Sequence, residues 1–97
     1  MSPEELIKWV LSVDRRYLAL TAFKDKPILK PSEVAQKNNR SVQNINRAFH
    51  ELEERGLVEN ITPGKHSWNK YMLTDSGKDV LRGLLQKLEE KFVTKTA

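Results

Sequence analysis

Residues 31–55 constrain the fold most strongly, because they predict two helices joined by a very short turn. Asn38 and Asn39 predict the end of the first helix, since asparagine adopts a left-handed backbone more readily than most residues. Ser41 is a good N-cap for the second helix, and Gly56 suits a left-handed C-cap at its end. The stretch therefore predicts a helix-turn-helix.

The second helix of this pair has a polar face suited to contacts with nucleic acid. Its apolar residues recur at spacings of three and four and form one face: Val42, Ile45, Phe49 and Leu52. The other faces carry hydrogen-bonding side chains, where an ordinary solvated helix carries Glu and Lys. Gln and Asn can pair with adenine edges, and Arg with guanine edges, in the major groove of DNA. We expect Gln43, Asn44 and Arg47 to lie nearest the base edges. A helical hairpin without a nucleic-acid role is the alternative.

The positive charge of the chain is concentrated in the same region. The formal net charge is +4, and residues 24–47 contain six Lys or Arg against two acidic residues. The next segment, residues 48–58, contains three Glu and one Arg. This distribution favours a polyanion, such as double-stranded DNA, at the N-terminal part of the second helix. An uneven surface with no partner is the alternative.

A β-hairpin over residues 57–73 is predicted to follow. Residues 57–62 and 68–73 have the character of strands, and Pro63-Gly64 is a strong turn signal between them. On a helix-turn-helix such a hairpin is called a wing. Its basic side chains are expected to contact phosphates or the minor groove: Lys65, His66 and Lys70.

The N-terminal part of the chain predicts further helix. Ser2 and Glu5 match a capping box, and apolar residues at helical spacing continue over residues 3–23 as one bent helix or as two. Residues 28–29 are candidates for a short strand that pairs with the hairpin.

A C-terminal helix is predicted over residues 75–92, with Thr74 as its cap and an apolar stripe at near-heptad spacing. The stripe either closes the core of the chain or packs against a second copy. We favour a homodimer, because the stripe is longer than a small core needs. The expected interface residues are Trp9, Leu81, Leu84, Leu85, Leu88 and Phe92.

Several classes of protein are disfavoured. The 97 residues fit one domain, and the chain has no cysteine for a disulfide framework. The two histidines have no partner at metal-ligand spacing, there is no glycine-rich phosphate loop, and no Ser-His-acid set can be argued. We therefore expect no metal, no cofactor and no enzymatic activity. No signal peptide or membrane-length apolar run is present, so a cytoplasmic protein is expected.

Three short motifs, taken in order, resemble the winged helix-turn-helix of MarR-like transcriptional regulators, including small archaeal and phage-type versions. They are Ser32-Glu33-Val34-Ala35, Leu52-Glu53-Glu54-Arg55-Gly56-Leu57-Val58 and Tyr71-Met72-Leu73-Thr74-Asp75-Ser76-Gly77. The resemblance covers about residues 14–82. It implies a dimeric DNA-binding regulator with a recognition helix at 41–55 and a wing at 59–73. Ser67-Trp68-Asn69 stands where the wing of that family has an acidic-x-arginine pair, so Lys65 and Lys70 would replace its arginine.

The sequence thus predicts an α+β winged-helix domain with a three-helix core, a β-hairpin wing and an additional C-terminal helix. The predicted function is sequence-specific binding of double-stranded DNA in transcription regulation. A protein-protein interaction module and a non-specific chromatin-type or RNA-binding protein are the alternatives. No small-molecule effector is indicated. The expected DNA contacts are Lys30, Ser32, Arg40, Ser41, Gln43, Asn44, Asn46, Arg47, His50, Lys65, His66 and Lys70.

Overall fold

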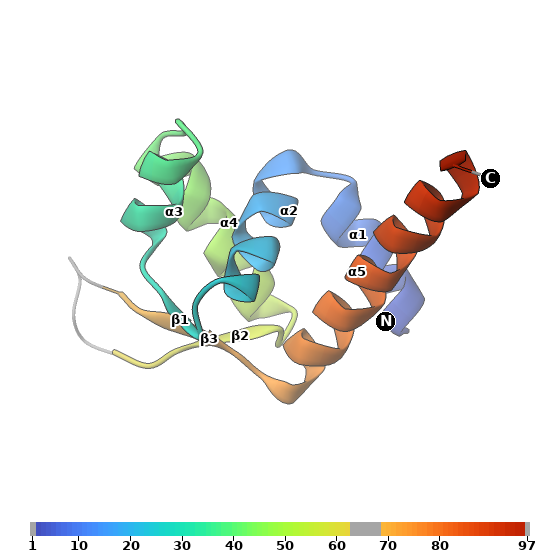
Figure 1. Cartoon of the computed structure of the whole chain (residues 1–97). Helices are drawn as coiled ribbons and strands as arrows, with labels where there is room; N and C mark the ends of the chain where they lie inside the picture. The colour runs from blue at the N-terminus through green and yellow to red at the C-terminus, as the bar shows by residue number, and fades with distance from the viewer. Residues whose placement is uncertain (1, 63–68, 97) are drawn as a thin grey trace.

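The computed structural model describes residues 2–62 and 69–96, with side chains described as far as residue 90. Lys65 and His66, and the side chain of Phe92, lie outside the described residues. Helices surround one side of a small antiparallel sheet, which confirms the predicted α+β winged-helix fold (Figure 1). The elements in order are α1 (Pro3–Leu11), α2 (Asp14–Thr21), the 3-10 helix η1 (Ala22–Lys24), β1 (Ile28–Leu29), α3 (Pro31–Lys37), α4 (Val42–Glu54), β2 (Val58–Asn60), β3 (Tyr71–Leu73) and α5 (Asp75–Thr96).

Local capping explains where the helices begin and end. The N–H of Glu5 donates to Ser2 Oγ at 3.2 Å, and the Glu5 carboxylate accepts a hydrogen bond from the Ser2 N–H, which confirms the capping box of α1. The N-terminal residues form two helices, α1 and α2, separated by Ser12 and Val13.

Among the described residues, none of the helices combines the length and the apolar character that a membrane span requires.

The helix-turn-helix consists of α3 and α4, as predicted. Asn39 has a positive φ of 54° in the turn, and Gly56 has a φ of 73° after α4. Ser41 caps α4, since its Oγ accepts a hydrogen bond from the N–H of Asn44 at 3.1 Å. The backbone of this motif therefore follows its turn and capping residues closely.

The sheet has the strand order β1-β3-β2, so the short strand β1 pairs with the hairpin as predicted. The hairpin strands are shorter than the predicted 57–62 and 68–73. The reason lies at Asn60, whose Oδ1 accepts a hydrogen bond from the N–H of Thr62 at 2.9 Å and bends the chain out of the strand. The Oγ1 of Thr62 then accepts from the Lys70 N–H at 2.9 Å, which holds the base of the wing together.

The core lies between the helices and the sheet. Phe49 of α4 stacks on Tyr71 of β3 with ring centroids 4.9 Å apart, and Phe23 meets Phe49 edge-on. Leu81 and Leu84 of α5 are also buried in this core. Both side chains are thus packed within their own chain, and their predicted role at a dimer interface stays a prediction.

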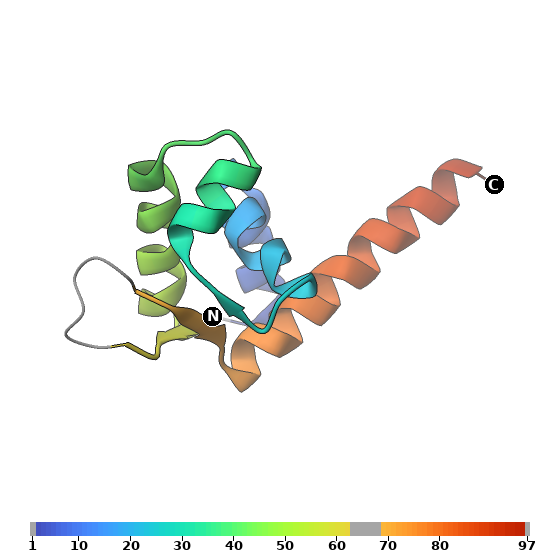
Figure 2. The ribbon, with the colours of Figure 1, turned by 60° about the vertical axis from the view of Figure 1, so that its left-hand side comes forward.

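Helix α5 closes the core with its first half and then runs past the body of the domain. It lies beside α1, and its C-terminal half extends away from the other elements (Figure 2). Its N-terminus is held by Thr74, whose Oγ1 accepts from the N–H of Gly77 at 3.0 Å and donates to the carbonyl of Gly56 at 2.6 Å. The end of α4 and the start of α5 are thereby joined.

The close approach of α5 to the start of β2 generates the first prediction. A Cβ on Gly77 would lie 1.9 Å from the carbonyl oxygen of Leu57, whereas a Cβ on Gly83 would meet only the flexible end of Ile7 at 2.8 Å. Gly77→Ala should therefore lower the free energy of unfolding by about 2–3 kcal/mol, because backbone cannot yield as a side chain does. Gly83→Ala should stay within about 1 kcal/mol of the wild type, since the helix propensity of Ala offsets the adjustment of Ile7.

Urea denaturation of the two variants checks this contrast, which is matched because both glycines lie in the same helix. Equal stability of Gly77→Ala and Gly83→Ala would mean that α5 does not approach Leu57 this closely.

Candidate nucleic-acid interface

One face of α4 brings together four of the predicted contact residues. The side of α4 opposite Phe49 and Leu52 is open to solvent, and its side chains line a shallow hollow. The lining residues are Gln43, Asn46, Arg47, His50, Glu51 and Glu54. Gln43, Arg47 and His50 are exposed, and Asn46 is half-buried. The N-terminal half of the face thus carries amide, guanidinium and imidazole groups, and the C-terminal half carries two carboxylates.

Asn44 does not share this face. The residue is half-buried, and its Oδ1 is shielded from solvent without a hydrogen-bond partner in the described part of the chain. Asn44 precedes Glu51 by about two helical turns, so both lie on the flank of α4 nearest α2, where Glu51 is among the lining residues of the hollow and Asn44 is not. Sequence reasoning placed Asn44 nearest the base edges. The structure places Asn46 beside Gln43 and Arg47 instead, because the buried residues of α4 fix how the helix is rotated about its axis.

An ion-pair cluster fixes α4 against α2. The Glu51 carboxylate accepts two hydrogen bonds from Arg15, at 2.8 and 2.9 Å, and one from Arg16 at 2.9 Å. The hydrogen bond from Arg15 is the main reason that the pKa of Glu51 falls from 4.5 to about 2. The arginine partners of Glu51 stand 35 and 36 residues away in the chain, so local sequence patterns around Glu51 do not predict these contacts. Adjacent arginines at the start of a helix were the available signal.

The same cluster includes Trp9 of α1. The guanidinium of Arg16 lies 4.1 Å from the centre of the Trp9 ring, and that of Arg55 lies 5.1 Å from it. Trp9 is half-buried and also packs against the core. Two arginines of its own chain therefore lie over the ring, and its predicted place at a dimer interface stays a prediction.

The remaining predicted contacts lie outside the exposed face of α4, around the start of α3, in the turn that leads into α4, and at the base of the wing. Lys30 is the half-buried residue before α3, Ser32 and Ser41 are exposed at helix starts, and Arg40 is exposed in the turn. Arg40 forms an ion pair with Asp14 at the start of α2. Lys70 is half-buried at the base of the wing. The described residues include no group of three or more His, Cys, Asp or Glu that could hold a metal ion.

Comparison with solved structures identifies the fold. The chain superposes on TubR bound to 24 bp of tubC from Bacillus thuringiensis serovar israelensis pBtoxis with a TM-score of 0.76 at 20% identity, covering 90% of this chain and 96% of that one. The MarR family transcription regulator SP03579 gives a TM-score of 0.76 at 18% identity, with 87% of this chain and 56% of that chain covered. A MarR mutant from E. coli complexed with operator DNA gives 0.66 at 18% identity, with 87% and 64% covered.

The chain thus has the winged-helix fold of these proteins. It spans almost all of TubR but less than two thirds of these two MarR chains. No protein-family model matches the sequence, and a search of curated proteins also returns no match. The similarity is therefore one of fold, at identities too low to carry residue roles across.

The ion-pair cluster predicts a pH-dependent contribution to stability. The folded pKa of Glu51 lies below its ordinary value, so the stabilisation is fully present above about pH 4.5 and is lost as pH falls through about 2. Glu51→Gln should lower the free energy of unfolding by about 1–3 kcal/mol at pH 7. The difference from the wild type should shrink steadily below pH 4.5.

Chemical denaturation between pH 7 and pH 3 measures this difference. Glu54→Gln, which changes an exposed glutamate on the same helix, is the control and should change stability by less than about 0.5 kcal/mol. A Glu51→Gln effect as small as the control, or independent of pH, would show that the arginines do not stabilise the folded state through Glu51.

Proposed function

We propose that this protein binds double-stranded DNA in a sequence-specific manner, as a dimer, and regulates transcription. The observation that carries the proposal is the exposed face of α4, where Gln43, Asn46 and Arg47 lie together on the second helix of a helix-turn-helix. Side chains of these types make paired hydrogen bonds to adenine and guanine edges in the major groove. Two of the solved structures with this fold contain DNA, which supports the proposal.

The charge along α4 favours entry by its N-terminal half. Arg47 and the capped N-terminus are positive at one end, and Glu54 is negative at the other. The phosphates on either side of the groove would then meet the flanking cations. The proposed phosphate contacts are Lys30, Arg40 and Lys70, with Ser32, Ser41 and His50 as polar contacts, and Lys65 and His66 on the part of the wing outside the described residues.

A protein-protein interaction module fits this face less well. Hot spots of protein interfaces are large side chains seated in well-packed, desolvated pockets. Val42, which is 47% exposed, is the large apolar side chain left open on the described part of α4. The face around it is polar and carries hydrogen-bonding groups at regular spacing, which suits base edges better than an apolar partner.

DNA binding in plasmid segregation is a second candidate function. The observation that favours it is the extent of one structural match. A mutant of the type III plasmid segregation protein TubR matches 92% of this chain over 95% of its own. The two candidates differ in where the DNA sites lie. Chromatin immunoprecipitation from the native cell should find separate sites upstream of genes for a regulator, and one cluster of sites on the replicon itself for a segregation protein.

The reading of bases by α4 can be tested with a duplex selected from random sequence. Asn46→Ala should weaken binding to the selected site by about 1–3 kcal/mol and binding to a scrambled duplex much less, because no charge is removed. Arg47→Ala should weaken both, since Arg also attracts phosphate. Affinities for the two duplexes at two salt concentrations measure these effects.

Asn44→Ala is the matched control, because it removes the same side chain from the packed flank of the same helix. It should change the ratio of the two affinities less than Asn46→Ala. Unchanged ratios in both Asn46→Ala and Gln43→Ala would contradict base reading and favour the non-specific alternative.

The proposed dimer rests on the second half of α5. Leu88 is 36% exposed there, Leu85 is half-buried, and Leu11 of the adjacent α1 is 39% exposed. Phe92 belongs to the same predicted stripe. Leu88→Glu would bury an unpaired charge in such an interface, so light scattering should report a monomer where the wild type is a dimer.

Ile28→Glu is the control for the dimer, because Ile28 is as exposed as Leu88 but lies on β1. It should leave the dimer intact. A wild-type protein that is monomeric at high micromolar concentration would refute the proposed interface.

A further inference from the structure

Arg40, in the turn between α3 and α4, is tied to the start of α2. Its Nη2 donates a hydrogen bond to a carboxylate oxygen of Asp14, which stands 26 residues earlier in the chain. The two arginines that follow Asp14 bind Glu51 on the flank of α4. The start of α2 therefore lies beside this flank, and Asp14 directs the guanidinium of Arg40 toward α2.

The ion pair between Arg40 and Asp14 is open to solvent. Their side chains are 44% and 59% exposed, whereas those of Arg15 and Glu51 are 22% and 21% exposed. An exposed ion pair changes an equilibrium constant by at most about fivefold, because water screens the attraction and both side chains lose freedom. A strongly charged anion can therefore displace Asp14 from Arg40 at small cost.

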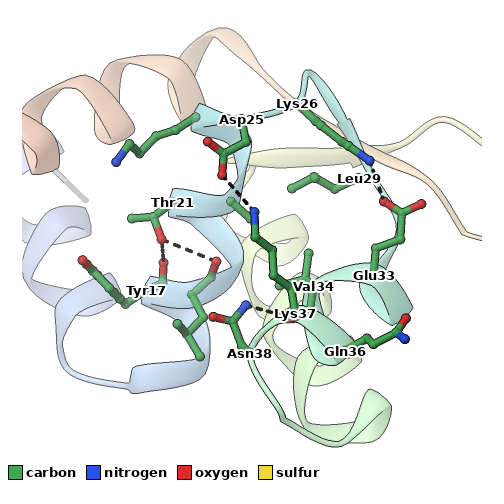
Figure 3. A pocket seen from close by; sticks show the side chains of 13 residues that line it. Tyr17, Thr21, Asp25, Lys26, Leu29, Glu33, Val34, Gln36, Lys37 and Asn38 are labelled. Atoms are coloured by element: carbon green, nitrogen blue, oxygen red, sulfur yellow. Dashed lines mark hydrogen bonds and ion pairs between the residues drawn. The ribbon is translucent and has the colours of Figure 1, made fainter.

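Two other exposed ion pairs lie near the helix-turn-helix, around a second hollow between α2 and α3 (Figure 3). Lys26 Nζ lies 3.4 Å from a carboxylate oxygen of Glu33, and Lys37 Nζ lies 3.4 Å from one of Asp25. Neither lysine lines the exposed face of α4. Arg40 differs from both, because it immediately precedes the N-cap of the helix that is proposed to enter the major groove.

We propose that Asp14 competes with a DNA phosphate for Arg40 and thereby limits the sequence-independent part of the affinity. This inference rests on the proposed DNA binding and adds a residue that acts on it through Arg40. In the free protein Asp14 neutralises the charge of Arg40. A phosphate that approaches Arg40 must displace Asp14 or share Arg40 with it, and two neighbouring anions repel each other. The contact is weakened for every DNA sequence alike, because phosphates carry no sequence information.

Asp14→Asn tests the competition in the full-length protein, since it removes the charge and keeps a side chain of nearly the same size. It should raise the affinity for a selected duplex and for a scrambled duplex equally, by up to about fivefold at low salt. The slope of log affinity against log salt should steepen by up to about one, because the charge of Arg40 is then fully available to a phosphate. Fluorescence anisotropy of labelled duplexes over a range of salt concentrations measures both effects.

Asp79→Asn is the matched control, because Asp79 forms an exposed ion pair with Arg82 on α5 at 3.3 Å and the net charge changes by the same amount. It should leave the slope unchanged. Asp14→Ser removes the charge with a different side chain and should steepen the slope as Asp14→Asn does. In an Arg40→Gln background, Asp14→Asn should have no more effect than Asp79→Asn. Thermal denaturation of each variant verifies that it is folded.

The outcomes separate this inference from the proposed function. A wild type that binds neither duplex would refute the proposed DNA binding and the competition with it. A wild type that binds both duplexes, with equal slopes for Asp14→Asn and Asp79→Asn, would overturn the competition alone. Weaker binding by Asp14→Asn would also overturn it, because Asp14 would then hold Arg40 in position for the phosphate. So would an effect of Asp14→Asn that persists in the Arg40→Gln background.

Discussion

The rotation of α4 about its own axis is the constraint on which the proposed DNA-binding face depends. Ile45, Phe49 and Leu52 are fully buried, and Phe49 stacks on Tyr71, so one side of the helix is committed to the core. Each residue turns the helix by about 100°. Burying this side therefore determines that Gln43 and Arg47 point outward and that Asn44 packs on a flank. The side chains of α4 that can contact a partner are therefore those that are not buried in the core.

The ion-pair cluster around Glu51 also restrains the position of α4. A packed apolar face resists tilting, but apolar contacts alone tolerate small rotations and shifts because they are not directional. The three hydrogen bonds from Arg15 and Arg16 are directional, and both arginines belong to α2. Trp9 extends this hold to α1 through the Arg16 guanidinium. Recognition of base edges requires side chains held at fixed positions. The hydrogen bonds at Glu51 would help to hold the proposed DNA-binding face of α4 in place, beside the apolar contacts on its other side.

The sequence correctly predicted the features of this structure that depend on residues close together in the chain. The cap at Ser41, the left-handed turn at Asn39 and the ending at Gly56 are local, so short motifs determined the helix-turn-helix. Contacts between residues far apart in the chain could not be predicted from the sequence. Glu51 and Arg15 are far apart in the chain, and the pair of adjacent arginines at the start of α2 does not indicate which carboxylate they bind. Choosing Asn46 over Asn44 required the rotational position of each residue about the helix axis. The apolar spacing of α4 constrains that rotation only loosely at its N-terminal end, where Val42 is 47% exposed.

The apolar stripe of α5 shows why periodicity cannot assign a partner. Val80, Leu84 and Leu88 continue one pattern, yet Val80 and Leu84 are buried in the core and Leu88 is 36% exposed. The change comes where the body of the domain ends and the helix continues (Figure 2). A hydrophobic core and a hydrophobic interface between chains are both built from apolar side chains. The sequence of the stripe therefore does not change between its buried part and its exposed part. The stripe is divided where the surface that supports α5 ends, and the close approaches at Gly77 and Gly83 lie on the supported part of the helix.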